Sequence, residues 1–309
     1  MNLSQLYYFR KLADLQHYAK AAKELYITQP SLSNAISSLE NELGVSLFQR
    51  TGRNIQLTKC GQEFLDYVEA GLDRIDKGVD IMKEYAGTSE GGKVDLGCII
   101  TVQTDYVPRL ITRFKFETGT SATFNVREDP SLPLMHDLKD GIYDVIFASK
   151  SDTDPLLSYT PILTQQVIVA MNSSSPLAKK EYIVPEDLRG HSLISYSDTI
   201  PLGKAVKEML DKLNVGRINY NYLDESILAG FAMHGVEAAV MLDTFFLKSV
   251  DGIEVRPLVN NLKEKKTFHH RIYMIHDQRN YHPRCVDHFI DYVVESHSLK
   301  EDPSKIYID

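Results

Sequence analysis

The chain has 309 residues, of which 43% are hydrophobic, so it is long enough for more than one domain with a buried core. Its net charge of −8 excludes a protein that holds nucleic acid through overall positive charge. Cys60, Cys98 and Cys285 are too few and too scattered for a disulfide framework. The start of the chain lacks a signal segment and no apolar run reaches membrane length, so we expect a cytoplasmic protein without a membrane partner.

A helix-turn-helix pattern lies near the start of the chain. Residues 18–25 form a short predicted helix, and the turn 26–27 separates it from a longer one that Thr28 caps and Pro30 opens. Gly44 ends the second helix. Helical spacing predicts one buried stripe on it, made of Leu32, Ile36, Leu39 and Leu43. This arrangement is typical of DNA-binding proteins.

Small polar side chains lie on the face of this helix opposite the stripe. Residues 1–60 carry a net charge of +3 and the remainder −11, which suits DNA contact at one end only. The helix contains no Lys or Arg, so phosphate contacts are expected mostly from its flanks, at Arg50 and Arg53. The predicted contacts on the helix itself are Gln29, Pro30, Ser31, Ser33, Asn34 and Ser37.

The stretch AAKELYITQPSLSNAISSLENELGVSLFQRTGRNIQLTKCG resembles the N-terminal domain of the LysR-type transcriptional regulators. The match includes Ala21-Ala22, residues 29–33, Leu43-Gly44, Leu47-Phe48 and the Leu57-Thr58 pair before Gly61. The resemblance implies a winged helix-turn-helix over residues 1–60 and a double-stranded operator as partner. It also implies a homodimer or homotetramer, with RNA polymerase as a further candidate partner.

A long amphipathic helix is predicted over residues 58–87. Apolar residues recur there with alternating spacings of three and four, the pattern of a coiled-coil seam. The predicted dimer seam is Leu65, Val68, Leu72, Ile75, Val79 and Met82. The alternative is an amphipathic helix that packs on its own domain. A length near 30 residues favours pairing with a second subunit.

Strands alternate with helices over residues 88–297, which predicts an α/β effector-binding domain. The family resemblance implies two lobes like those of type II periplasmic binding proteins, joined by two crossover strands near 163–166 and 265–270. Lobe I then comprises 91–163 and 268–297, and lobe II comprises 164–267. Residues 298–309 read as a polar tail.

A small-molecule effector is expected between the lobes, because ligands of α/β folds bind beyond the carboxyl ends of strands. Thr101 matches a hydroxyl position that often touches effectors in the family. The segments around residues 100–103, 129–131 and 149 contain no Lys or Arg, which favours a small mono-carboxylate or an uncharged polar metabolite. Ordinary loop and helix-cap roles are the alternative for each residue. The predicted effector residues are Ile100, Thr101, Gln103, Ser131, Ser149, Ser195 and Pro201.

Other chemistries have weaker signals. No nucleotide-binding, nucleophile-elbow or zinc-protease motif is present, so we expect no enzyme, no cofactor and no metal. The spacing of His282, Cys285 and His288 offers no fourth zinc ligand. Two regulatory alternatives remain: redox control through Cys98 and Cys285, and constitutive DNA binding with lobes used only for oligomerisation. The pair His269-His270 is expected to be solvated.

Overall fold

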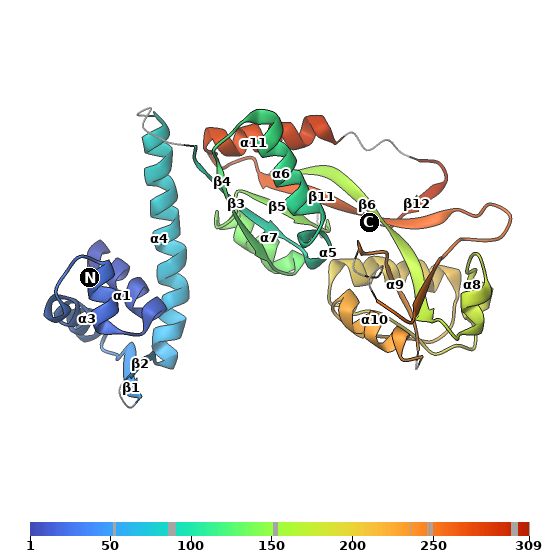
Figure 1. The fold of residues 1–309 in the computed structure, drawn as a ribbon, viewed down its shortest axis with the longest axis horizontal. Coiled ribbons are helices and arrows are strands. Elements are labelled where there is room, and N and C mark those ends of the chain that lie inside the picture. The colour runs from blue at the N-terminus through green and yellow to red at the C-terminus, as the bar shows by residue number, and fades with distance from the viewer. Residues whose placement is uncertain are drawn as a thin grey trace. The chain divides into compact units, whose positions relative to one another are not determined.

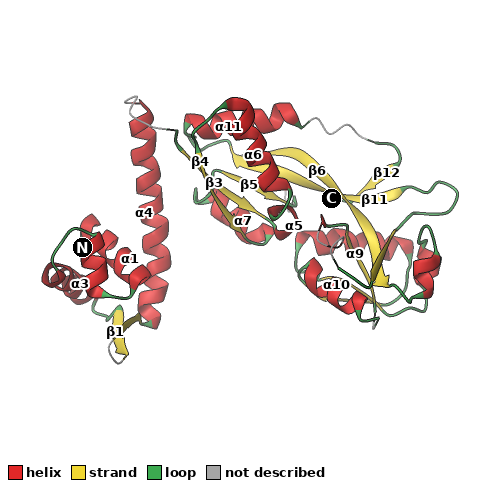
Figure 2. Ribbon diagram, in the orientation of Figure 1, coloured by secondary structure: helices red, strands yellow, loops and turns green. Residues whose placement is uncertain are grey.

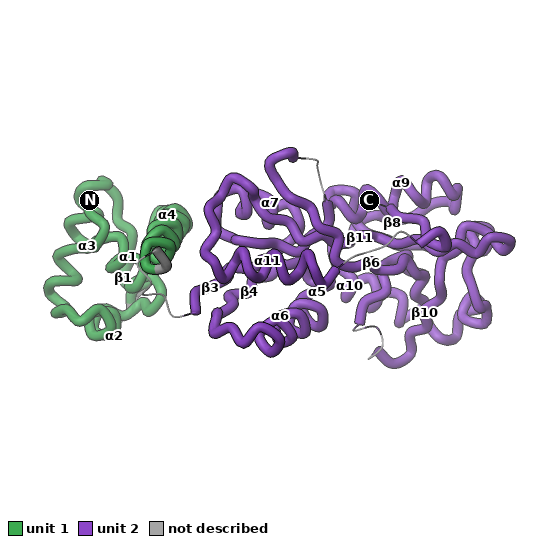
Figure 3. The backbone as a smooth tube through the Cα atoms, turned by 90° about the horizontal axis from the view of Figure 1, so that it is seen from above, with its two compact units in different colours: residues 1–88 green, residues 89–309 purple. Residues whose placement is uncertain are grey.

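A computed structural model gives the structure of residues 1–51, 54–85, 91–150, 154–235, 237–245, 247, 250–297 and 302–308. The chain divides into two compact units, Met1–Thr88 and Ser89–Asp309, and each is considered separately (Figure 3). No helix within the described ranges is long and apolar enough to cross a bilayer.

The first unit is a helical domain with a two-stranded wing (Figures 1 and 2). Thr28 caps the third helix by accepting a hydrogen bond from the Ser31 amide at 3.3 Å, and Pro30 lies in its first turn. Gly44 ends that helix with φ of 72°, a left-handed conformation that glycine adopts without strain. The elements are α1 (Leu3–Leu15), α2 (Tyr18–Glu24), α3 (Gln29–Leu43), β1 (Phe48–Thr51), β2 (Asn54–Leu57) and α4 (Lys59–Tyr85).

The core of this unit forms where α1, α2 and α3 meet. Phe9 and Leu12 of α1 are fully buried against Ala21 of α2 and the apolar stripe of α3. The stripe contains Leu32, Ile36 and Leu39, as predicted. The prediction was wrong for Leu43, which is 36% exposed because it is the last residue of α3 and lies beyond the core.

The helix α4 has two different halves. Val68 and Leu72 are buried in the core of their own unit, and Leu65 packs against that core. Arg10 of α1 pairs with Asp73 and Asp76 of α4 at 3.1 and 3.3 Å, so polar contacts also attach the middle of α4 to α1. These contacts contradict the single predicted seam, because the first half of the apolar stripe is already covered within the chain.

The second half of α4 carries exposed apolar side chains. Ile75, Val79 and Met82 are 44%, 48% and 58% exposed. They continue the stripe at spacings of four and three residues, so they lie on one face of the helix. Only this half keeps an apolar face free for a second subunit, and its pairing stays a prediction.

The second unit contains two α/β lobes that share two long antiparallel strands, β6 (Leu157–Asn172) and β11 (Thr267–Asp277). β6 pairs with β11 up to Gln165, and from Val167 onward it pairs with β9 (Ala238–Leu242). Each crossover is therefore the interior of a continuous strand. The hydrogen-bonded order is β4-β3-β5-β11-β6-β9-β7-β8, with β10 on β6 and β12 on β11.

The first lobe surrounds a short parallel sheet. Its core includes Phe114, Phe147 and Phe289 from three different elements, and the Phe289 ring packs against the other two. The elements are β3 (Lys93–Cys98), α5 (Ile100–Gln103), α6 (Tyr106–Thr118), β4 (Thr123–Glu128), α7 (Ser131–Lys139), β5 (Val145–Ala148) and α11 (Arg284–Ser296).

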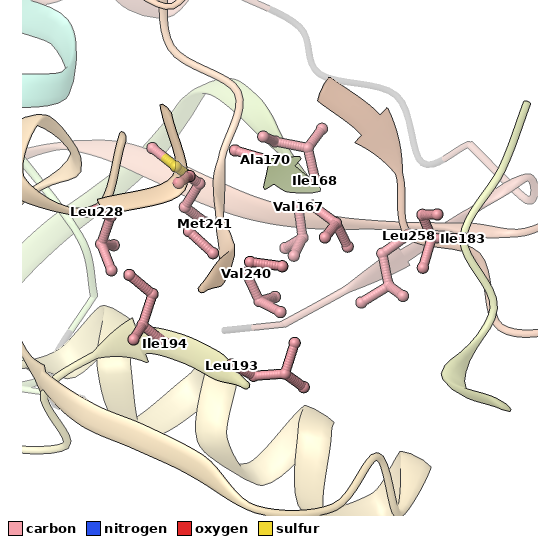
Figure 4. Packing of buried hydrophobic residues seen from close by; sticks show 14 of the residues in the cluster. Val167, Ile168, Ala170, Ile183, Leu193, Ile194, Leu228, Val240, Met241 and Leu258 are labelled. Carbon is pink, nitrogen blue, oxygen red and sulfur yellow. The ribbon is translucent and has the colours of Figure 1, made fainter. Parts of the chain in front are cut away.

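The second lobe is built around β7 and β9, whose side chains are buried along their whole length. Val167, Leu193 and Val240 are among the side chains that meet in its core (Figure 4). A near-continuous apolar strand is expected where helices cover both faces of a parallel sheet. The remaining elements are η1 (Pro176–Lys179), α8 (Pro185–Leu188), β7 (Leu193–Tyr196), α9 (Pro201–Leu213), β8 (Ile218–Tyr222), α10 (Glu225–Met233) and β10 (Ile253–Pro257).

The segment expected to be a polar tail contains a strand. β12 (Lys305–Tyr307) pairs in parallel with Thr267–His269 of β11. The prediction missed this strand, because only long-range pairing with β11 stabilises so short a segment.

Candidate functional site

The outer face of α3 presents short polar side chains to solvent. Gln29, Pro30, Ser31, Asn34 and Ser37 are exposed, and Ser33 is half-buried. These residues lie on one side of the helix, and the apolar stripe on the other side fixes its orientation. Amide and hydroxyl groups on a helix that fits a major groove can hydrogen-bond base edges. α3 therefore has the composition of a base-reading helix, and its DNA contacts stay a prediction.

The wing is fastened to both neighbouring helices. Glu40 of α3 accepts hydrogen bonds from the Leu47 and Phe48 amides at 2.7 and 3.1 Å. The Thr58 hydroxyl donates to the Ser46 carbonyl at 2.8 Å and accepts from the Gly61 amide at 2.9 Å. Gly61 must be glycine, since a Cβ there would lie 2.1 Å from the Leu47 carbonyl oxygen. The wing and α3 therefore move as one body.

Arg50 is exposed on β1, opposite Ile55 of β2, where its guanidinium can reach a phosphate. Arg53, the second predicted phosphate contact, lies outside the described residues.

A cavity of about 330 Å³ lies between the lobes of the second unit. Residues of α5 and α6 form one wall, β6 crosses it, and the loop after β9 forms the other wall. It is lined by Thr101, Val102, Asp105, Tyr106, Arg109, Leu163, Gln165, Asp243, Thr244 and Phe245. Its size suits a small metabolite.

Three buried side-chain oxygens without a hydrogen-bond partner in the described part of the chain belong to residues that line this cavity. They are Thr101 Oγ1, Gln165 Oε1 and Thr244 Oγ1. They come from α5, the crossover strand β6 and the loop after β9, so both lobes and the crossover contribute one each. Buried polar groups are nearly always paired, so a shared cavity with three unpaired groups points to a polar ligand.

The charged groups at the cavity are of both signs. Arg109 forms an ion pair with Asp105 at 3.3 Å, one helical turn apart on the solvent side of α6. Asp243 contributes a second carboxylate from the opposite lobe. One guanidinium beside two carboxylates leaves the lining with a formal charge of −1, which disfavours a dianion.

Two family models match this chain. Residues 3–62 match the bacterial regulatory helix-turn-helix protein, lysR family, and residues 87–298 match the LysR substrate binding domain. The chain belongs to the LysR family.

Known LysR-type proteins resemble the chain along most of its length. It is 32% identical over 252 residues to the uncharacterized HTH-type transcriptional regulator YybE of Bacillus subtilis strain 168, covering 81% of this chain and 85% of that protein. The structure of CbnR, a LysR family transcriptional regulator, matches 96% of this chain and 100% of its own with a TM-score of 0.72 and 21% identity. The effector-binding domain of QuiR in complex with shikimate matches 67% of this chain and 97% of its own, with a TM-score of 0.60 and 22% identity.

Of the effector residues predicted in this LysR-type chain, Thr101 lines the cavity. Ile100 and Gln103 lie on the same short helix α5 but are not among the lining residues. Ser131 and Pro201 begin α7 and α9 and also lie outside the lining.

The two buried serines of the predicted set already have partners. The Ser195 hydroxyl donates to the Val240 carbonyl at 2.7 Å and is fully buried in the second lobe. Ser149 lies 2.8 Å from His270 Nε2 and is 2% exposed. Neither serine is among the residues that line the cavity, and an effector contact for either stays a prediction.

The sequence prediction missed most of the cavity wall. Gln165 lies within the strand β6, and Thr244 follows the buried strand β9. A polar residue that interrupts or ends an apolar run could have indicated a binding site. Arg109 and Asp105 are spaced as an ion pair on a helix, which does not by itself indicate a ligand. These residues meet Gln165 and Thr244 at one cavity only because β6 and β11 cross between the lobes.

The paired histidines at the crossover are buried, which contradicts the expected solvated pair. His269 and His270 are 7% and 2% exposed. Burial lowers the pKa of His269 to about 4, so this imidazole is neutral at physiological pH. The solvated interpretation was wrong because β11 carries both residues through the centre of the unit.

The three residues with metal-like spacing have separate environments. His282 Nε2 lies 3.2 Å from the Asp277 carbonyl, and Cys285 Sγ lies 3.5 Å from the Lys93 carbonyl. The His288 ring packs against Phe114. Within the described residues, no group of three His, Cys, Asp or Glu side chains could hold a metal ion.

Proposed function

We propose that this LysR-type regulator binds an operator as a dimer and responds to a small polar molecule held in the cavity between its lobes. The effector half of the proposal rests on the three unpaired oxygens that belong to residues lining that cavity. A ligand that pairs with Thr101 and Gln165 on one side and Thr244 on the other favours one angle between the lobes over others. Ligand binding to these three residues would therefore change the angle between the lobes.

The chemistry of the wall favours a hydroxylated mono-carboxylic acid. Gln165 Oε1 accepts hydrogen bonds, so it needs a ligand hydroxyl, while the two threonine hydroxyls can donate to ligand oxygens. Arg109 can share its charge with one carboxylate. The QuiR domain, which has a similar fold, is in complex with shikimate. A phosphorylated ligand would meet too little positive charge beside Asp105 and Asp243.

Thr244→Val and Thr101→Val should each weaken effector binding by about 1–3 kcal/mol, which is roughly 5- to 150-fold in Kd. Valine keeps the shape of threonine and leaves the ligand group unpaired. A thermal-shift screen of mono- and dicarboxylic acids on the full chain identifies the ligand, and calorimetry then measures the affinity of each variant.

Thr112→Val is the matched control, because Thr112 lies exposed on α6 and its hydroxyl bonds to the Pro108 carbonyl. It should bind the ligand as the wild type does. Equal affinity of all four proteins for a ligand found in the screen would place the effector site elsewhere.

Asn34→Ala should cost about 1–3 kcal/mol of operator affinity and relax the preference at one base pair, because Asn34 is exposed on α3. Arg50→Ala should weaken binding to all DNA sequences alike and make the salt dependence shallower. Binding titrations on operator and random duplexes at several salt concentrations separate the two effects.

Asn219→Ala serves as the control, since Asn219 is an exposed residue of β8 in the other unit. An unchanged ratio of operator to random-duplex affinity in Asn34→Ala would contradict base reading by this residue.

Redox control has weaker support. Burial raises the pKa of the Cys98 thiol to about 12, so almost none of it is the reactive thiolate at neutral pH. Cys98 packs with the apolar core of the first lobe. The cavity and its unpaired polar atoms support a small-molecule effector, whereas the buried Cys98 gives little support to a Cys98–Cys285 switch.

A further inference from the structure

Residues 302–308 form a segment that lies beyond the match to the LysR substrate binding domain, which ends at residue 298. Within it, β12 runs parallel to β11 with Lys305 opposite Thr267 and Tyr307 opposite His269 (Figure 1). The Thr267 amide donates to the Ser304 carbonyl at 3.3 Å, and the Ile308 amide donates to the His269 carbonyl at 2.9 Å. The segment is thus an extra strand along the crossover. We call it the 302–308 strap.

Side chains on both faces hold this strap in place. Ile306 and Ile308 pack against the core of the second lobe. The Arg271 guanidinium lies 3.8 Å from the centre of the Tyr307 ring, which is close enough for a strong cation–π contact. The strap begins with a turn in which Asp302 accepts hydrogen bonds from the Ser304 amide and hydroxyl at 2.9 and 2.6 Å. Its position is therefore fixed by packing as well as by pairing.

The strap connects the two lobes along the chain. α11 precedes it, and Val286, Phe289 and Val293 of α11 are buried in the core of the first lobe. Ile306 and Ile308 join the second lobe. The described segments on either side of residues 298–301 therefore belong to different lobes.

One imidazole extends the strap to the first lobe. His270 Nδ1 lies 2.9 Å from the Ile308 carbonyl and Nε2 lies 2.8 Å from the Ser149 hydroxyl. A carbonyl can only accept, so Nδ1 carries a proton, and in the neutral imidazole Nε2 then accepts from the Ser149 hydroxyl. Ser149 directly follows β5 of the first lobe. His270 and Ser149 are both 2% exposed, so water does not compete for these bonds.

We propose that the 302–308 strap restrains the crossover and sets the resting angle between the two lobes. A strand that packs on the second lobe and has a buried hydrogen-bond bridge to the first lobe removes freedom that two strands alone would allow. The angle that it sets is the one on which the effector acts, and this last step rests on the proposed function. The restraint itself exists without ligand.

The test compares the full chain with a form that lacks residues 302–309, both without ligand. A fluorophore pair is introduced through unnatural amino acids at exposed Phe116 of α6 and Lys212 of α9. Each labelled chain is diluted with unlabelled protein, so that an oligomer holds one pair. Single-molecule energy transfer should give a broader or longer distribution of interlobe distances after deletion, and the Thr267 amide should exchange at least tenfold faster.

Two further variants keep the test decisive if the shortened chain folds poorly. Ile306→Ser/Ile308→Ser keeps the chain length and removes the apolar anchors, so it should reproduce the deletion. Ser149→Ala removes only the bridge, so it should widen the distance distribution without speeding Thr267 exchange. Faster Thr267 exchange with an unchanged distance distribution would overturn the proposal, as would no change in either. Because no ligand is used, failure here leaves the effector site untouched, and failure of the effector screen leaves the strap untouched.

Discussion

Ile75→Asp should abolish dimer formation at micromolar protein concentration and reduce operator binding far more than it reduces the folded fraction. Ile75 is 44% exposed and shares one face of α4 with Val79 and Met82, outside the core of the unit. A carboxylate there would be desolvated in an apolar interface without a partner, so the helices would separate. Sedimentation measures the oligomeric state, and titration on an operator measures the affinity lost when two DNA-binding units no longer bind together.

Two comparisons on the same helix separate assembly from folding. Leu72→Asp should unfold the first unit, because Leu72 is 1% exposed in its core. Tyr67→Asp is the matched control, since Tyr67 is 80% exposed and lies about 80° round the helix from Ile75 at roughly 100° per residue. An intact oligomer in Ile75→Asp would show that α4 does not mediate pairing.

Glu225→Gln should remove a pH dependence of stability worth about 2–3 kcal/mol between pH 5 and 8. Glu225 is buried at the start of α10 and accepts a 2.7 Å hydrogen bond from the Tyr196 hydroxyl, which itself accepts from the Leu242 amide at 2.9 Å. Burial raises the pKa of Glu225 from 4.5 to about 7, with neighbouring Asp224 adding to the rise.

Proton binding determines whether stability rises or falls with pH. Between pH 4.5 and 7 the folded carboxyl keeps a proton that the unfolded one releases, so stability falls as the pH rises and the loss is complete above about 7. Glutamine cannot ionise, so urea unfolding of the variant should lack this fall. His269, whose pKa is lowered, destabilises both proteins equally as the pH drops below about 6.5.

Exposed Glu208 of α9 provides the isosteric control, because Glu208→Gln should keep the wild-type pH profile. A Glu225→Gln protein with the same fall in stability as the wild type would place the titration on another group.

The DNA-binding unit was largely predictable because its signals are local. Thr28, Pro30 and Gly44 fix the ends of α3 through neighbouring backbone groups, and these are legible in the sequence. The spacing of Leu72 and Ile75 was also legible, but a periodic stripe does not reveal whether its own domain or a partner covers it. Burial of Leu72 within the unit depends on α1, which lies far away in the chain.

The cavity and the strap were harder to predict because they depend on long-range pairing. Thr101 follows β3, so the rule of strand ends located it. Gln165 meets the cavity only because β6 continues from one lobe into the other, and Ile306 is ordered only because β11 offers an edge. Composition described the segment 302–308 as polar, and its two isoleucines are what the second lobe contacts.

Because the first half of α4 is packed into the first unit, a small tilt of this long helix produces a larger displacement at its far end. Its first half packs in the same core as α3 and is hydrogen-bonded to the segment before the wing, so a turn of the helix also turns the polar face of α3. Its 27 residues span about 40 Å at 1.5 Å per residue. A tilt of about 5° at one end of such a helix moves the other end by roughly 3.5 Å, close to the 3.4 Å rise of one base pair. In the proposed dimer, rotations of this size between subunits would therefore shift α3 on an operator by about one base pair.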